Sequence, residues 1–355
     1  MPEPLPKLHG RGASVDPHNR FETLGITLDP AEWDADDERP GQRTVFYRDA
    51  SKTVLARNSS PDIGYDVSLN PYRGCEHGCI YCYARQTHEY LGFSLGLDFE
   101  SRIMVKEDAP ELLRRELASP RWQPQLVGMG GVTDIYQPVE RKLELTRRCL
   151  EVFLDFRNPV GLVTKSHLIT RDLELLQEMS HYGLVSVAIS LTTLNDDLWR
   201  VMEPRTASPA RRLEAVRQLA EVGVPVGVLT SPIIPGLNDH EIPRLVAAAA
   251  EAGAQFAGYG MVHLPYGVKD LFADWVKATF PERADRVLNR IREMRGGKLN
   301  DPRFGHRMRG EGPFAEQISS LHKLACKRAG LPKGRSRVST KHFRVPGRVE
   351  QPSLF

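Results

Sequence analysis

The sequence predicts an α/β protein with a parallel β-sheet, in which short apolar strands alternate with longer amphipathic helices. The chain has 355 residues, of which 41% are hydrophobic, so it is long enough to bury a large core. Strands that alternate with helices at this spacing are joined by crossover connections and therefore pair in parallel. Six β-rich apolar runs are the predicted strands: 66–69, 126–130, 160–164, 184–191, 224–230 and 256–263.

Between these strands lie five segments whose apolar residues recur at helical spacing. The predicted helices are 108–118, 140–156, 171–181, 209–222 and 239–252. Residues typical of helix ends bound several of them. These are Asp108, Ser208 and Asp239 as N-caps, and Gly183, Gly223 and Gly253 just after the helix ends.

Composition divides the chain into four parts. Residues 1–60, with an acidic run at 34–38, are predicted to form an extended N-terminal arm of low intrinsic order. Residues 61–289 form the core, residues 290–345 a basic C-terminal extension, and residues 346–355 a flexible tail.

Nothing in the sequence indicates export or a membrane partner. The first seven residues lack the apolar segment of a signal peptide, and no stretch approaches the roughly 18 uninterrupted apolar residues of a membrane span. Five cysteines, three of them bunched, are not a disulfide framework. Cys149 and Cys326 stand alone on predicted helix faces and are interpreted as core thiols. We expect a cytoplasmic protein, because free thiolates persist in a reducing compartment.

Cys75, Cys79 and Cys82 form a C-x3-C-x2-C motif. Three thiolates on one short loop suit zinc, copper(I) or an iron–sulfur cluster. No second C-x-x-C or H-x3-H pair supplies a fourth ligand, so one ligand position stays open. His77 completing a zinc site is one alternative, although tetrahedral closure within a single loop is cramped. Redox-labile surface thiols are the other.

With Tyr81 just before its last cysteine, the motif resembles the signature of the radical SAM superfamily. The resemblance covers about residues 68–266 and implies a partial (β/α)6 barrel, which the six predicted strands match. It also implies a 4Fe-4S cluster on the three cysteines, with S-adenosylmethionine (SAM) bound to the open iron. Reductive cleavage of SAM would then give a 5'-deoxyadenosyl radical, and the electron would come from a reductant such as flavodoxin or ferredoxin.

The residues that follow the predicted strands resemble the spore photoproduct lyase branch, which includes proteins described as DNA repair photolyase-like. The resemblance implies contact with SAM at five positions: Gly130, Gly131, Thr133, Lys165 and Ser190. A tight turn is the alternative role for the glycines. A lysine at the end of so apolar a strand needs an anionic partner or solvent.

Tyr81 and Tyr83 match the paired tyrosines of this branch and are our candidate catalytic residues for hydrogen relay. Packing around the cluster is the alternative role for at least one of them. Spore photoproduct lyase itself has a cysteine beside the SAM-contacting turn, where this chain has Gly-Gly-Val-Thr at 130–133. This departure puts reversal of thymine dimers by that route in doubt. Segments 202–206 and 231–238 are predicted to shape the substrate mouth or to be proline-stiffened loops.

Positive charge is concentrated near the C-terminus. Residues 290–348 contain 16 Lys and Arg but only 4 Asp and Glu. The basic residues alternate with aromatic side chains and His, a mixture suited to phosphates and stacked bases. Nucleic acid is therefore the predicted partner, and a solvated cap over the open side of the barrel is the alternative.

The last five residues resemble the short peptide by which bacterial DNA polymerases and repair proteins bind the sliding clamp. Leu354 and Phe355 would be its apolar anchors, with Gln351 setting the register. The alternative is that these two apolar residues fold back onto the barrel.

Three functions follow from these patterns. The preferred one is a radical SAM enzyme that abstracts hydrogen from a nucleic-acid substrate, in DNA repair or modification. The second is a non-catalytic iron–sulfur protein that binds DNA at the replication fork. The third is a radical SAM enzyme for a peptide or small metabolite, which would leave the basic extension unexplained.

Overall fold

Six parallel strands form the centre of the protein, as predicted. The computed structural model describes residues 10–13, 15, 17, 19–21, 44–332 and 338–347. In its main sheet the strand order is β10-β9-β8-β7-β6-β3-β2, and all neighbours are parallel except the β2–β3 pair at the edge. The strands are β2 Leu55–Arg57, β3 Val67–Leu69, β6 Val127–Met129, β7 Val160–Thr164, β8 Val185–Ser190, β9 Val226–Ile233 and β10 Ala257–Met261.

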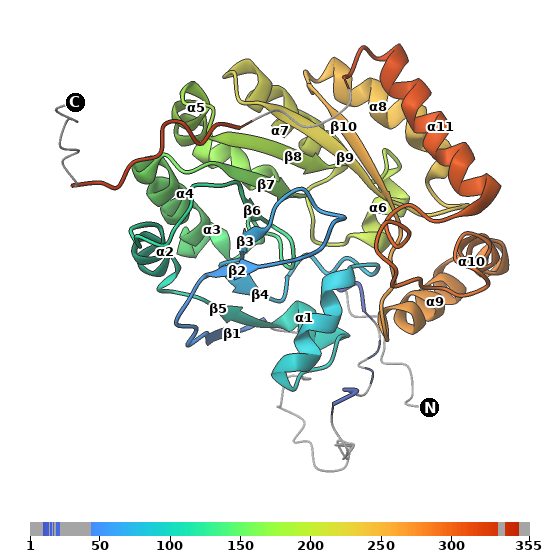
Figure 1. Ribbon diagram of the computed structural model, residues 1–355. Coiled ribbons are helices and arrows are strands. Elements are labelled where there is room, and N and C mark those ends of the chain that lie inside the picture. Colours follow the sequence, from blue (N-terminus) through green and yellow to red (C-terminus); the bar gives the residue numbers. More distant parts are fainter. Residues whose placement is uncertain are drawn as a thin grey trace.

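Amphipathic helices cover the outer face of this sheet (Figure 1). They are α2 Ala109–Leu117, α4 Leu145–Phe156, α5 Leu173–His181, α7 Pro209–Glu221 and α8 Ile242–Glu251. Their apolar faces and the strands share one large buried core. Because β2 and β10 are not paired with each other, the sheet stays open on one side. The prediction of an α/β fold with six parallel strands in an open, partial barrel is confirmed.

Predicted helix ends were mostly correct, and the differences have local causes. Glu144, at φ 50°, divides the predicted helix 140–156 into α3 (Glu140–Leu143) and α4. Ser208 caps α7 by accepting from the backbone N–H of Arg211. Asp108 and Asp239 cap nothing with their side chains, because their carboxylates accept from Arg48 and from the N–H of Gly236. The three predicted capping glycines have positive φ angles between 65° and 93°, as expected.

The predicted N-terminal arm needs correction, since part of residues 1–60 belongs to sheets. Strand β1 (Val45–Arg48) pairs with β5 (Arg102–Val105), which also pairs with β4 (Tyr72–Arg73) to form a second, three-stranded sheet. Strand β2 forms the antiparallel edge of the main sheet. These strands bury little side-chain area, so their pairing leaves only a weak signal in the sequence.

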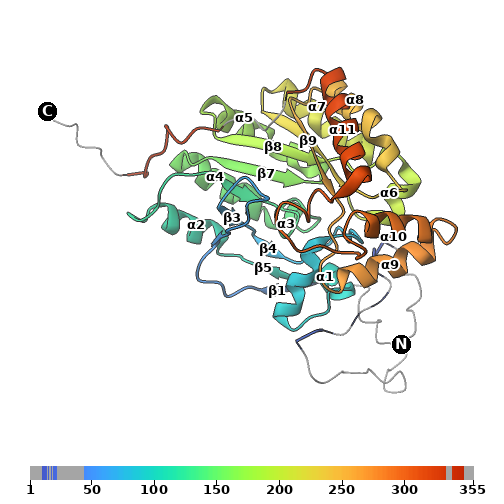
Figure 2. The same cartoon turned by 45° about the vertical axis from the view of Figure 1, so that its right-hand side comes forward.

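The predicted boundary at residue 289 falls inside helix α10 (Ala284–Glu293). This helix buries Val287, Leu288 and Ile291, and it packs against α9 (Val268–Thr279). Helix α11 (Gly312–Arg328) packs against α8, as both views show (Figures 1 and 2). The basic extension is therefore packed on the core, and one of its arginines, Arg295, is buried and donates to the carbonyls of Val262 and Arg307.

Part of the basic extension spans the open side of the barrel. On one edge the N–H of Met261 in β10 donates to the carbonyl of Met308 at 2.9 Å. On the other edge Arg307 and the N–H of Gly305 bind the carboxylate of Asp62, 2.5 and 2.7 Å away. This is the arrangement expected of a cap, which was the alternative role for the extension.

Several basic residues of the extension already have partners within the chain. Arg303 pairs with Asp301 and Glu311, and Arg290 with Glu293. The side chain of Arg344 donates to the carbonyl of Asp155. Lys333, Arg335 and Arg337 lie outside the described residues, as does the clamp-like peptide at 351–355. Nucleic-acid binding by the extension remains a prediction.

The two isolated cysteines differ in burial. Cys149 is fully buried on α4, as predicted for a core thiol. Cys326 on α11 is half-buried, with its sulfur 3.6 Å from Nδ1 of His322. No helix within the described residues is long and apolar enough to cross a membrane.

Candidate active site

The three cysteines lie on the cluster loop, residues 74–82, which joins β4 to the 3-10 helix η2 (Tyr83–Leu91). Cys75 and Cys79 are buried, and Cys82 is half-buried. Burial raises the pKa of the Cys75 thiol, and the charges of Asp134, Cys79 and Cys82 raise it further. Burial also raises the pKa of Cys79, to about 12. Buried thiolates therefore need a bound cation, and this donor set fits an iron–sulfur cluster.

A single metal ion would need its ligands gathered around one point. Among residues 44–332 and the other described parts, no three His, Cys, Asp or Glu side chains gather around one point as one ion requires. In a four-iron cluster each thiolate binds its own iron, so the sulfurs need not converge in this way. His77, the alternative zinc ligand, is held by another group.

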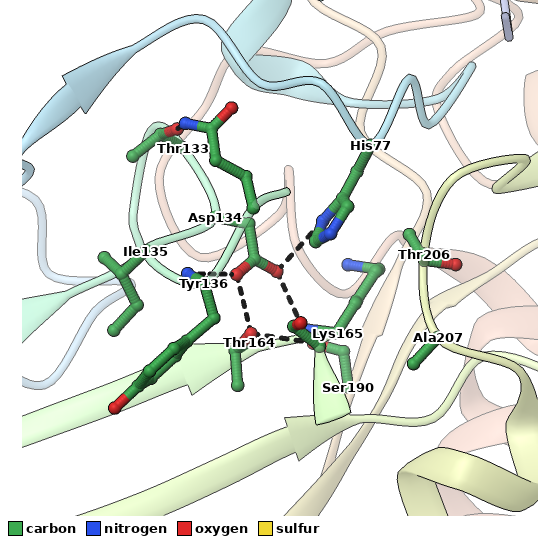
Figure 3. Close-up of polar contacts among 12 residues, drawn as sticks. His77, Thr133, Asp134, Ile135, Tyr136, Thr164, Lys165, Ser190, Thr206 and Ala207 are labelled. Carbon is green, nitrogen blue, oxygen red and sulfur yellow. Dashed lines mark hydrogen bonds and ion pairs between the residues drawn. The ribbon is translucent and has the colours of Figure 1, made fainter. Parts of the chain in front are cut away.

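That group is Asp134, which follows β6 and connects the cluster loop to the end of β7 (Figure 3). One carboxylate oxygen accepts from the N–H of Tyr136 at 2.9 Å and the hydroxyl of Thr164 at 2.6 Å. The other accepts from the N–H of Lys165 at 2.7 Å and lies 3.3 Å from Nδ1 of His77. Burial favours the neutral acid, but His77 and these hydrogen bonds together lower the pKa of Asp134 well below its usual range. Asp134 is therefore a fixed anion that positions the loop.

Glu76 attaches the loop to the segment that follows β6. Its carboxylate accepts from the N–H of Val139 at 2.8 Å, the hydroxyl of Thr44 at 3.1 Å and Arg205 at 3.3 Å. The N–H of Glu76 donates to the side chain of Gln137 at 2.9 Å. The buried carboxylate thus has partners from three separate regions of the chain.

Thr133, predicted to contact SAM, also holds the loop. Its hydroxyl donates to the carbonyl of Gly74 at 2.5 Å and accepts from Gln137 at 3.1 Å. The hydroxyl proton is therefore already used within the protein. Contact between this side chain and SAM stays a prediction.

Segment 202–206, predicted to shape the substrate mouth or to be a proline-stiffened loop, packs on the cluster loop. It begins at the last residue of helix α6 (Asp196–Met202), whose carbonyl accepts from the N–H of Ile80 at 3.1 Å. Glu203 is fully buried and accepts hydrogen bonds from the hydroxyl of Tyr81 and the guanidinium of Arg212. The Tyr81 hydroxyl is thus committed to a structural bond, which favours the packing role for this tyrosine.

The N-terminal segment reaches the same loop. The N–H groups of Gly12 and Ala13 donate to the carboxylate of Glu100, at 3.0 and 2.8 Å. Glu100 also pairs with Arg85 at 2.5 Å, and both of these side chains are fully buried. Arg85 in turn donates to the carbonyl of Cys79 at 3.0 Å. A chain of contacts therefore connects residues 12 and 13 to a cluster cysteine.

Lys165 and Ser190 lie at the ends of the paired strands β7 and β8, and Lys165 interacts with the cluster cysteine Cys79. The Lys165 ammonium is 5.8 Å from the centre of the Tyr81 ring. Burial disfavours its charge, but the neighbouring Cys79 and Glu203 outweigh burial and raise the pKa of Lys165. Among the residues drawn in Figure 3, no interaction is marked to the Lys165 ammonium or to the side chain of Ser190. Both are thus available to a ligand.

The predicted glycine turn has packing reasons of its own. Gly130 has φ +95°, and a Cβ there would lie 2.2 Å from the carbonyl oxygen of Val163. The carbonyl of Gly131 accepts from the hydroxyl of Tyr83 at 2.5 Å. Tyr83 is exposed, and its ring centre lies 6.3 Å from that of His263, just beyond β10. A side chain at position 130 is excluded by the turn itself, whether or not SAM binds there.

Comparison with known proteins identifies the family of this chain. A model described as the radical SAM superfamily matches residues 69–249. The chain belongs to the radical SAM superfamily. This superfamily implies a 4Fe-4S cluster and SAM, and the loop with Cys75, Cys79 and Cys82 has the donor set to hold the cluster.

Individual relatives range from uncharacterised proteins to a named lyase. An uncharacterised protein of Mycobacterium tuberculosis (strain ATCC 25618 / H37Rv) is 34% identical over 271 residues, covering 75% of this chain and 78% of the relative. Spore photoproduct lyase of Bacillus subtilis (strain 168) is 25% identical, covering 61% and 62%. A solved spore photoproduct lyase mutant with bound AdoMet and dinucleoside spore photoproduct has a TM-score of 0.59 at 16% identity, covering 80% and 79%. The structural likeness shows that the fold is shared.

The cysteines were evident from the sequence, whereas most of their supports were not. Arg85, Glu100, Glu203 and Arg212 form two fully buried ion pairs around the loop. The nine-residue spacing between Glu203 and Arg212 places the arginine on the helix that follows, but nothing in the sequence marks the pair as buried. The contact of Glu100 with residues 12 and 13 spans almost ninety positions and leaves no local pattern.

The contact between the N-terminal segment and the cluster loop yields a prediction. A Cβ on Gly12 would lie 1.7 Å from the carbonyl oxygen of Gly78. Gly12→Val should therefore expel this segment, break its two hydrogen bonds to Glu100, and lower the free energy of unfolding by about 1–3 kcal/mol. The measurements are the melting temperature and the iron bound per chain after anaerobic reconstitution. Both should fall.

Gly64→Val is the matched control, because a Cβ at Gly64 meets no other atom within 4 Å. It should leave both quantities unchanged. Normal iron content and stability in Gly12→Val would show that the segment does not support the loop.

Proposed function

We propose that this radical SAM protein is an enzyme that cleaves SAM reductively and acts on nucleic acid, in repair or modification of DNA. The observation that carries the proposal is the group of three cysteines on one loop, with the Lys165 ammonium interacting electrostatically with Cys79 and with Ser190 at the end of the neighbouring strand. Cys75, Cys79 and Cys82 would hold the cluster. When bound, the cluster and SAM together supply a 5'-deoxyadenosyl radical.

The chain's own residues have distinct roles in this proposal. The Lys165 ammonium would balance the carboxylate of SAM, and the Ser190 hydroxyl would donate to or accept from it. Asp134 and Glu203 hold the loop and remain ionised, because hydrogen bonds and neighbouring positive groups outweigh their burial and lower their pKa values. Gly130 and Gly131 would let the backbone approach SAM closely.

Nucleic acid as substrate is supported by two observations. One relative with a named activity, spore photoproduct lyase, has been solved with a dinucleoside ligand. Residues 290–348 carry a large excess of positive charge. The chemistry need not be that of spore photoproduct lyase, because no cysteine stands at 130–133 and the Tyr81 hydroxyl is bound to Glu203.

A substrate other than nucleic acid is the second candidate. It is favoured by the internal ion pairs of Arg290, Arg303 and Arg307, which reduce the charge available to a phosphate backbone. A non-catalytic iron–sulfur protein at the replication fork is a third, and turnover of SAM separates it from both enzymes.

The central test is anaerobic reconstitution followed by chromatographic detection of 5'-deoxyadenosine. We expect about four irons and four sulfides per chain, and production of 5'-deoxyadenosine that increases when DNA is added. Replacing any one of Cys75, Cys79 and Cys82 by Ala should abolish the cluster and the product. Cys149→Ala is the control, because that thiol lies in the apolar core, and it should keep both.

Stoichiometric zinc with no reconstitutable brown chromophore would contradict the proposal. Cleavage of SAM at a rate that DNA does not change would instead favour a substrate other than nucleic acid.

Lys165 and Ser190 should hold SAM without holding the cluster. Lys165→Ala removes a charge-assisted contact, so SAM affinity should fall by roughly ten- to a hundredfold, and Ser190→Ala should weaken it by roughly tenfold or less. Equilibrium dialysis of SAM and iron analysis measure the two properties separately. Loss of iron in both variants, or unchanged affinity, would mean that the assignment carried over from the resemblance is wrong.

We further propose that the last five residues bind a bacterial sliding clamp. Gln351→Ala, or deletion of Leu354 and Phe355, should abolish retention on an immobilised clamp, because two apolar anchors and their polar register are lost. Iron content and SAM cleavage should not change. Equal clamp binding by the truncated protein, or a melting temperature several degrees lower, would show that the tail belongs to the fold.

A further inference from the structure

A cavity lined by arginines lies beside the cluster loop and is not used by the function proposed above. Its volume is about 550 Å³, which is within the usual range for small-molecule sites. Its basic lining residues come from four parts of the chain: His77 from the cluster loop, Arg141 from α3, His167 and Arg171 from the β7–α5 connection, and Arg205 and Arg211 from the α6–α7 region. None of the three cysteines, Lys165 or Ser190 lines it.

The charges in this cavity are not balanced. No Asp or Glu is among the described residues that line it. Arg171 is neutralised by Asp172 at 2.8 Å and Glu140 at 3.2 Å, and Arg205 by Glu76 at 3.3 Å. These three carboxylates are buried behind the arginines. Two of the four guanidinium groups therefore have their charge compensated from within the protein.

The other two arginines have no such compensation. Arg211 donates to Nδ1 of His167 at 3.3 Å and has no carboxylate partner within the described residues. The side chain of Arg141 makes no hydrogen bond or ion pair to any described residue, and both arginines are exposed. Burial and the charge of Arg211 lower the pKa of His167, as expected beside uncompensated positive charge. The Nε2 atom of His167 is buried without a partner.

The arrangement of these groups selects the chemistry of a ligand. A guanidinium binds carboxylate and phosphate oxygens through two parallel hydrogen bonds. A single carboxylate would neutralise only one of the two free arginines. A terminal phosphate carries about −1.5 to −2 charges at pH 7 and three acceptor oxygens, so it matches both. Successive phosphodiesters of a strand supply the same chemistry.

We propose that this cavity is a binding site for phosphate groups, carried either by a free nucleotide or by a nucleic-acid strand, with Arg141 and Arg211 as the principal contacts. The site is separate from the cysteines, so it does not depend on the radical chemistry. If the strand is the source, the cavity would place its backbone beside the cluster loop.

The test uses the full-length protein and two probes, pyrophosphate and a fluorescein-labelled single-stranded DNA of ten nucleotides. Calorimetry and fluorescence anisotropy measure their dissociation constants for the wild type, R141A, R211A and the double variant. Each single change should weaken pyrophosphate binding by roughly tenfold, and the double change by more. R217A is the control, because Arg217 is also on α7 but lies outside the cavity and pairs with Glu214. It should bind like the wild type.

The two probes separate the two sources. Parallel loss of DNA and pyrophosphate binding identifies a strand as the ligand, whereas loss of pyrophosphate binding alone identifies a free phosphate compound. Circular dichroism melting checks the fold, which two exposed arginines should not affect.

Three outcomes would overturn the proposal. The first is absence of binding for both probes to the wild type, or equal binding by the double variant. The second is succinate binding as tightly as pyrophosphate, which would make this a carboxylate site. The third is a double variant that binds pyrophosphate as the wild type does but whose cluster is reduced more slowly by flavodoxin. The two arginines would then be a docking site for an acidic protein. Cleavage of SAM is measured separately, so failure here is distinct from failure of the proposed function.

Discussion

The structure depends on holding a buried loop that forms neither strand nor helix between residues 74 and 82. Such a loop cannot satisfy itself by regular backbone pairing, so buried carboxylates hold it: Glu76, Glu100, Asp134 and Glu203. An unpaired buried carboxylate costs several kcal/mol. Each of these four carboxylates therefore accepts from several donors. If a donor moved away, it would leave a buried carboxylate unpaired. The loop and its supports fix each other.

The supports come from parts of the chain that are far apart, and this explains what the sequence could and could not predict. The six parallel strands repeat a local pattern of apolar runs and helical spacing, so they were predictable, as were the clustered cysteines. The pairing of Glu100 with Gly12 and Ala13, and of Glu203 with Tyr81, joins positions separated by 87 to 122 residues. Local periodicity contains no information on such contacts. Strands β1 and β2 were missed for a related reason, because their side chains bury too little to show a pattern.

Charge shows the same limit of sequence reasoning. Counting basic residues draws attention to 290–348, yet Arg303 and Arg307 are paired with carboxylates, one of them Asp62 near the other edge of the sheet. The two arginines left uncompensated, Arg141 and Arg211, are 70 positions apart in regions of ordinary composition. Whether a site has an excess of positive charge thus depends on where the carboxylates are buried, and only the fold determines this.

The C-terminal segment 338–347 lies on the side of the barrel opposite the cysteines. It crosses the amino ends of the strands, where the N–H of Arg344 donates to the carbonyl of Phe156 and that of Ser339 to the carbonyl of Gly183. The cysteines and the arginine-lined cavity are at the opposite, carboxyl ends. The segment that ends at residue 347 thus lies on the side of the amino ends of the strands. A partner held by the sequence beyond residue 347 would then be tethered from the side of the amino ends. The carboxyl ends, where the cysteines lie, would stay open to a separate substrate.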